Sequence, residues 1–141
     1  MSLNTSIKLF TAALLGSALT AGAAHAGAII SNGVVQLGVN NEGHLNFGGG
    51  TPSFSTGTTV VGLRDVATNY ESTSNGCLCE GWGAGIGPAG VSGYANISSS
   101  PGIGGVTNLF VQSFASTAST ATSVVNVGTS LQVTHASMPP P

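Results

Sequence analysis

Two closely spaced cysteines are the residues whose type and spacing most clearly suggest chemistry. Cys77 and Cys79 lie two positions apart in a glycine-rich segment. Such thiols could form a redox pair or bind a metal. A metal would need two more ligands, and no spacing links His44 or His135 to the cysteines. A disulfide that staples the segment is the simpler interpretation, with intermolecular bonds or free thiols as alternatives.

A glycine motif follows the cysteines but lacks the context that phosphate binding needs. Residues 85–90 match G-x-G-x-x-G by letter. No strand pattern precedes the motif, no helix pattern follows it, and no acidic residue occurs after Glu80 to bind a ribose. We therefore interpret the segment as a glycine-rich loop and expect no cofactor.

Hydrolase signatures are equally incomplete. The segment around Ser92 fails the G-x-S-x-G pattern, because Tyr94 occupies the position of the last glycine. A serine triad would have to form in space from Asp65 and either His44 or His135. Serine is so common in this chain that the coincidence carries little weight. We expect no catalytic residues and no enzymatic activity.

The remaining charged residues predict surface roles. Glu42 and Glu71 lie beside turn or polar residues, so we expect both carboxylates to be solvated. Arg64 and Asp65 are adjacent at the end of a strand pattern and suggest a surface ion pair. None of these residues lies in a metal-ligand spacing, so we expect no metal site.

Three aromatic residues define an alternative function. Tyr70, Trp82 and Tyr94 lie in or just after the irregular region 65–90. If these rings were exposed together, they would form a stacking surface for a sugar. The chain would then be a secreted carbohydrate-binding module or a hydrolase that uses this loop. A core role would instead bury Trp82.

The first 26 residues have the pattern of a signal peptide. Lys8 is the only positive charge before an apolar, uncharged run at 9–24, and Ala24-His25-Ala26 supplies the small residues of a cleavage site. We predict cleavage between Ala26 and Gly27 and export to the periplasm, cell surface or extracellular space. No later apolar run is long enough to span a bilayer.

Composition limits the partners of residues 27–141. Only 4% of the chain is charged, and these residues contain one arginine and four acidic side chains, a formal charge of −3. Nucleic-acid binding needs clustered lysine and arginine, so we expect no nucleic-acid partner. Low charge favours self-association, and extracellular polysaccharide is the other expected partner.

The chain alternates apolar and polar residues over short segments, which indicates β-strands. We predict a hairpin of strands 33–40 and 44–47 around a turn at 40–43, and a strand at 58–64. Later strands are predicted at 91–97, 106–115, 116–127 and 131–135, with a tight turn at 128–129. In the segment 106–115, alternation places Leu109 and Val111 on one face and Phe110 and Phe114 on the other.

These patterns predict an all-β fold, with antiparallel sheets packed as a β-sandwich and loops rich in Gly, Ser and Thr. The expected organisation is a signal peptide at 1–26, a single β-rich domain at 27–135 and a proline-rich tail at 136–141. Because a strand pattern precedes the tail so closely, we expect an incomplete domain with an open strand edge.

Four phrases resemble the N-terminal part of bacterial exported proteins that carry a PEP-CTERM sorting tail. They are SNGVVQLGVNNEGHLN at 31–46, TTVVGLRDVAT at 58–68, GCLCEGWG at 76–83 and ASTATSVVNVGTSLQVTH at 118–135. The resemblance implies a Gram-negative host, export, and a fate at the cell surface or in extracellular polymer. It implies no enzymatic activity. The chain departs from that class in having no sorting tail, since Pro139-Pro140-Pro141 is not Pro-Glu-Pro followed by an apolar span.

Overall fold

The protein is described by a computed structural model that covers residues 27–73, 80–88, 90–95 and 106–141. The predicted signal peptide, Cys77 and Cys79 lie outside these residues. Every regular element in the described part is a strand, and the strands form three antiparallel sheets. The predicted all-β, antiparallel fold is therefore confirmed. No helix that could cross a membrane occurs in the part of the chain that the structure describes.

The first sheet has the strand order β1-β2-β3-β4. Its strands are β1 (Ala28–Ser31), β2 (Val35–Val39), β3 (Leu63–Asp65) and β4 (Tyr70–Glu71). The turn between β1 and β2 is closed by Asn32, whose side-chain oxygen accepts the backbone N–H groups of Val34 and Val35 at 2.9 and 2.8 Å. Gly33 supplies the positive φ of 89° that this turn requires.

Two sequence predictions for this sheet were only partly correct. β2 forms its main hairpin with β1, which the alternation pattern did not indicate, and the segment 44–47 pairs with β2 only at one residue. That segment makes only isolated bridges, between Leu45 and Val39 and between Phe47 and Val61. The predicted strand 58–64 is likewise reduced to β3 and the bridge at Val61. The turn predicted at 40–43 is present, with the Gly43 N–H donating to the Asn40 carbonyl at 3.0 Å.

The second sheet, in the order β10-β9-β8, contains the longest strands. They are β8 (Leu109–Ser116), β9 (Ala121–Val127) and β10 (Leu131–Ser137). The single strand predicted over 116–127 is instead two strands joined by a turn at 117–120. The Thr117 hydroxyl accepts the backbone N–H groups of Ser119 and Thr120, at 3.2 and 3.0 Å, and this local bonding ends the strand.

A β-bulge in β8 changes which side chains face the core. Val111 pairs with Val125 and Ser113 pairs with Val124, so one extra residue is inserted between them. After the bulge, Phe114 pairs with Ser123 and shares the inner face with Leu109 and Val111. The predicted grouping of Phe114 with Phe110 was therefore wrong, because strict alternation cannot anticipate an inserted residue.

The third sheet is short and has the order β5-β6-β7. Its strands are β5 (Trp82–Gly85), β6 (Ser92–Ala95) and β7 (Val106–Thr107). Asn108, with a φ of 55°, separates β7 from β8, so one chain segment passes from this sheet into the second. β6 lies inside the strand predicted at 91–97, whereas β5 lies in the region predicted to be irregular.

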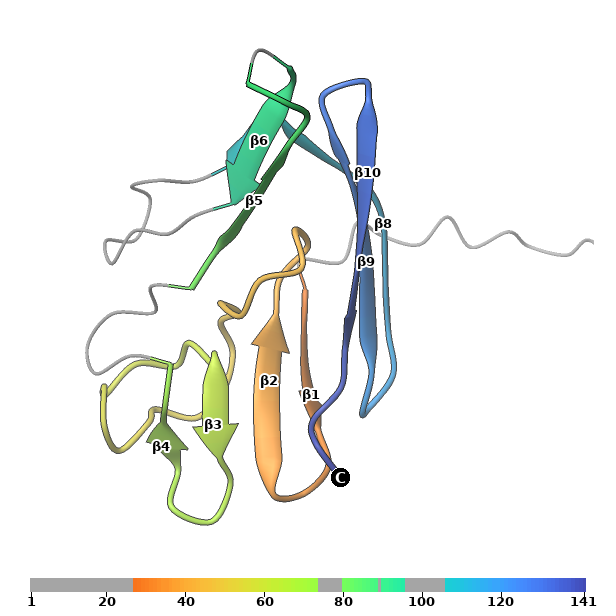
Figure 1. The fold of residues 1–141 in the computed structure, drawn as a ribbon. Helices are drawn as coiled ribbons and strands as arrows, with labels where there is room; N and C mark the ends of the chain where they lie inside the picture. The colour runs from red at the N-terminus through yellow and green to blue at the C-terminus, as the bar shows by residue number, and fades with distance from the viewer. Residues whose placement is uncertain (1–26, 74–79, 89, 96–105) are drawn as a thin grey trace, which may run out of the picture.

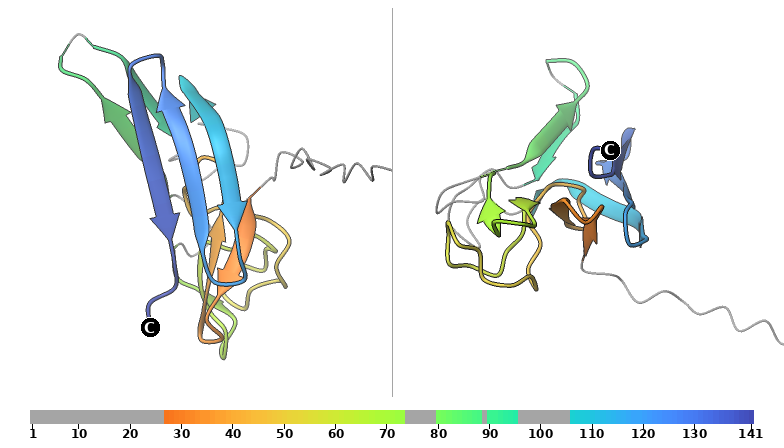
Figure 2. Two further views of the ribbon diagram at one scale, coloured as in Figure 1. Left: turned by 90° about the vertical axis from the view of Figure 1, so that its right-hand side faces the viewer. Right: turned by 90° about the horizontal axis from the view of Figure 1, so that it is seen from below.

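The second sheet forms a long layer against which the two other sheets pack, one near each end (Figures 1 and 2). One core joins its lower end to the first sheet through Ile30, Leu37, Val39 and Ala121. The other core joins its upper end to the third sheet through Ala95, Leu109, Val125 and Val127. Between Ala121 and Val125, the inward position on β9 is Ser123, so a polar level separates the two cores.

Candidate functional site

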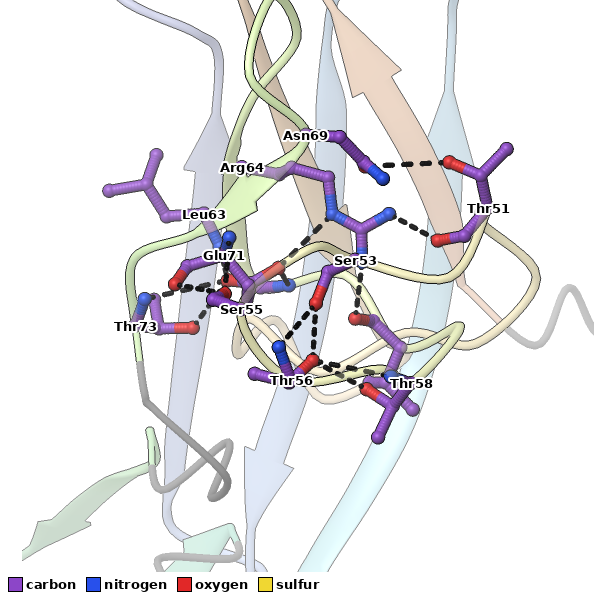
Figure 3. Close-up of polar contacts among 12 residues, drawn as sticks. Thr51, Ser53, Ser55, Thr56, Thr58, Leu63, Arg64, Asn69, Glu71 and Thr73 are labelled. Atoms are coloured by element: carbon purple, nitrogen blue, oxygen red, sulfur yellow. Dashed lines mark hydrogen bonds and ion pairs between the residues drawn. The ribbon is translucent and has the colours of Figure 1, made fainter.

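Two polar groupings are buried in the described structure, and the first is an ion pair. Arg64 on β3 lies directly opposite Glu71 on β4, and its Nε is 3.5 Å from Glu71 Oε2 (Figure 3). The two residues are 1% and 0% exposed. The predicted surface pair of Arg64 with Asp65 and the predicted solvation of Glu71 were both wrong.

Both charged groups make several hydrogen bonds, although within the described residues the buried Arg64 Nε has only the ion-pair contact with Glu71. The Arg64 guanidinium donates from Nη1 to the Thr51 carbonyl at 2.6 Å and from Nη2 to the Val60 carbonyl at 2.8 Å. The Glu71 carboxylate accepts the backbone N–H groups of Gly62 and Leu63 at 3.0 and 2.8 Å, and the Thr73 hydroxyl at 2.8 Å.

This network fixes the loop before β3 to the edge of the first sheet. Burial of the two charges without partners would be very costly, so the network persists only as a complete set. A Cβ atom at Gly62 would lie 2.2 Å from the Thr73 hydroxyl oxygen and 3.0 Å from Glu71 Oε1, so a larger residue there would displace Thr73 from Glu71. Arg64, the only arginine or lysine after the predicted cleavage site, is thus used inside the fold.

Asp65 has a separate, local role at the surface. Its carboxylate accepts the backbone N–H of Thr68 at 2.7 Å and the Thr68 hydroxyl at 2.6 Å. These hydrogen bonds, led by the one from the hydroxyl, lower the pKa of Asp65. The interaction closes the turn between β3 and β4 and leaves Asp65 outside any grouping with a histidine.

The second grouping lies at the polar level between the two cores, and we call it the junction cluster. Its members come from the turn after β2, from the start of β5 and the segment just before it, and from the inner face of the second sheet. They are Asn40, Asn41, His44, Glu80, Trp82, Ser123 and His135. The cluster is the place where all three sheets meet.

His44 is the most buried titratable member, with 3% of its surface exposed. Asn40 Oδ1 accepts the His44 backbone N–H at 3.1 Å, which turns Asn40 Nδ2 toward His44 Nε2 at 2.8 Å. Since an amide nitrogen only donates, Nε2 accepts and the ring proton lies on Nδ1. Burial, reinforced by the nearby His135, lowers the pKa of His44 from 6.5 to about 4. His44 is therefore neutral at physiological pH.

His135 connects β10 to the two other sheets. Its ring lies against Trp82, with centroids 4.5 Å apart and planes tilted by 51°. Trp82 Nε1 donates to the Glu42 carbonyl at 2.8 Å. Gly43, with a φ of +87°, leaves room for the same imidazole, because a Cβ there would lie 2.6 Å from the ring. Burial lowers the pKa of His135 as well.

Glu80 and Ser123 complete the cluster by holding the turn after β2. One Glu80 oxygen accepts the Leu45 N–H, and the Ser123 hydroxyl donates to the Asn41 carbonyl. Burial raises the pKa of Glu80, while the bond from Leu45 opposes this effect. The serine hydroxyl is therefore bonded to the backbone and not to a histidine, so it does not form the nucleophile–base pair of a serine hydrolase.

Three buried polar atoms of the cluster have no hydrogen-bond partner within the described residues: Asn41 Oδ1, His44 Nδ1 and His135 Nε2. The described residues contain no group of three or more His, Cys, Asp or Glu side chains arranged to hold a metal ion. The cluster connects the sheets through polar contacts.

The three aromatic residues proposed for stacking are not gathered on one face. Tyr70 is on β4 of the first sheet, whereas Trp82 and Tyr94 are on β5 and β6 of the third. Trp82 pairs with the buried Ala95, and Tyr94 pairs with Gly83, so the indole and the phenol point to opposite faces. Tyr70 and Tyr94 are 41% and 45% exposed, while Trp82 is half-buried in the junction cluster.

Sequence reasoning considered His44 and His135 but did not bring them together. Ninety-one positions separate them, and neither carries a motif. One signal was available: Ser123 is the only polar residue at the inward positions of β9, and His135 follows two apolar inward residues of β10. The chain matches no protein-family model, no curated protein and no solved structure.

Proposed function

We propose that this chain is an exported, non-enzymatic β-sheet protein of the cell surface or extracellular matrix of a Gram-negative bacterium. The observation that carries the proposal is the segment 1–26, in which a lysine, an uncharged apolar run and Ala-His-Ala follow each other as in a signal peptide. The resemblance to exported proteins with a PEP-CTERM tail supports the same destination.

The buried polar groups support a structural role. Arg64 and Glu71 fasten a loop to the first sheet, and the junction cluster holds three sheets together. The ion pair and the hydrogen bonds of these two groupings all connect residues of the fold to one another. A carbohydrate-binding role receives less support, since Trp82 donates its indole N–H internally and lies on the face opposite Tyr94.

The test is fractionation of a Gram-negative culture that expresses the full chain from Met1. We expect the protein in the extracellular polymer fraction, detected by peptide mass spectrometry. Leu15→Arg places a charge in the apolar run and should retain the protein in the cytoplasm. Leu3→Arg is the matched control, because a positive charge before the apolar run is compatible with export.

Two outcomes would contradict the proposal. Equal cytoplasmic retention of the parent and of Leu15→Arg would show that residues 1–26 do not direct export. Export into the medium without association with polymer or cells would contradict the surface or matrix location.

A further inference from the structure

The open edge of β10 is the largest unprotected strand edge of the described fold. β10 is seven residues long and pairs with β9 through its whole length without a register shift. Within the described residues, no backbone hydrogen bond reaches β10 from a strand other than β9. In Figure 2 (left) it is the outermost strand of its sheet. A row of backbone N–H and C=O groups is thus available for another strand.

The other sheet edges are short or protected. β4 and β7 have two residues each, and β1 and β5 have four. At the opposite edge of the second sheet, β8 carries the bulge between Val111 and Ser113, which twists a strand and discourages pairing. β10 is neither short nor interrupted by a bulge, and it contains no proline, glycine, aspartate, glutamate, lysine or arginine.

Charge makes a second copy of this chain the suitable partner. No Asp, Glu, Lys or Arg occurs after Glu80, so two β10 strands can approach without repulsion between like charges. The only titratable side chain of β10 is His135, which faces inward against Trp82. The strand is therefore electrically neutral where two copies would meet.

We propose that two copies of this protein pair antiparallel through β10, edge to edge, around a two-fold axis at Thr134. Thr134 is the middle residue of the strand, so this register uses all seven residues. It places Thr134 opposite its symmetry mate and Val133 opposite His135 of the second copy. The two three-stranded sheets then form one continuous six-stranded sheet. This inference goes beyond the proposed function and concerns purified protein, so it is tested independently of location.

The test is sedimentation of the purified protein over a range of concentrations. We expect a reversible monomer–dimer equilibrium. Thr134→Lys places two ammonium groups face to face across the axis and should shift the equilibrium strongly toward monomer. Thr122→Lys is the matched control: Thr122 is also exposed on the outer face, but it lies on the central strand β9 and should leave the dimer intact.

A charge-reversed variant separates repulsion from misfolding. Thr134→Glu alone should also be monomeric, and mixing it with Thr134→Lys should restore dimers, which a merely unfolded variant would not do. A parent protein that is monomeric at every concentration would overturn the proposal. So would a dimer unaffected by Thr134→Lys, equal dissociation of Thr122→Lys, or failure of the mixed variants to associate.

Discussion

Acid should destabilise this protein through His44. The pKa of its imidazole is lowered from 6.5 to about 4 in the folded state, chiefly by burial. Between these two pH values, the unfolded chain binds a proton that the folded chain excludes. Stability is therefore highest above pH 6.5 and falls as pH decreases toward 4. The difference of about 2.5 in pKa, at about 1.4 kcal/mol for each pH unit, corresponds to about 3.5 kcal/mol, of which about 3 kcal/mol is lost by pH 4.

Denaturant unfolding at several pH values between 4 and 7.5 measures this effect. His44→Gln keeps a neutral group that can bond to Asn40 but cannot be protonated, so its free energy of unfolding should fall less on acidification. The parent should lose about 3 kcal/mol more than the variant. The pKa of His135 is also lowered, so in both proteins His135 adds to the decrease in the free energy of unfolding on acidification. The pKa of Glu80 is raised, so in both proteins Glu80 opposes this decrease in the free energy of unfolding as the pH falls. Parallel pH profiles for parent and variant would refute this reasoning.

Three further perturbations follow from the structure and the sequence. Glu71→Ala leaves the Arg64 charge buried and unpaired and should cost about 3 to 5 kcal/mol in denaturant unfolding, far more than the control Thr122→Ala at an exposed position of β9. A loss no greater than the control's would contradict a structural role for the pair. Gly43→Ala places a side chain at a φ of +87° and against the His135 ring, so it should lower the midpoint of thermal unfolding. Because His135 contacts Trp82, the tryptophan fluorescence of the folded variant should also differ from that of the parent. An unchanged midpoint would contradict this prediction. Cys77 and Cys79 should form a disulfide in exported protein, with a non-reduced mass about 2 Da below that of the dithiol; two alkylatable thiols would reject this.

The sequence was most informative where strands are long and alternate regularly. β2, β6, β9 and β10 all lie largely within segments whose period of two is clear. β5 was missed because two glycines in Trp82–Gly85 remove the alternating side chains that define a strand pattern. The orientation of Phe114 was mistaken because one inserted residue in β8 inverts every later position.

The buried polar groupings depend on tertiary contacts that a linear pattern does not encode. Arg64 and Glu71 meet only because a short turn closed by Asp65 brings β4 beside β3. His44 and His135 meet because the turn after β2 reaches the second sheet at the level of Ser123. The sequence predicted a solvated Glu71 and a pair of Arg64 with Asp65, whereas sheet packing sets the partners of these side chains.

The N-terminal residue of the protein recovered outside the cytoplasm tests the central claim, export of this β-sheet protein, most directly. The account predicts a chain that begins at Gly27, directly after the Ala-His-Ala segment. N-terminal sequencing combined with intact mass should give this single species. A chain that retains Met1 and stays in the cytoplasm or the inner membrane would contradict the account.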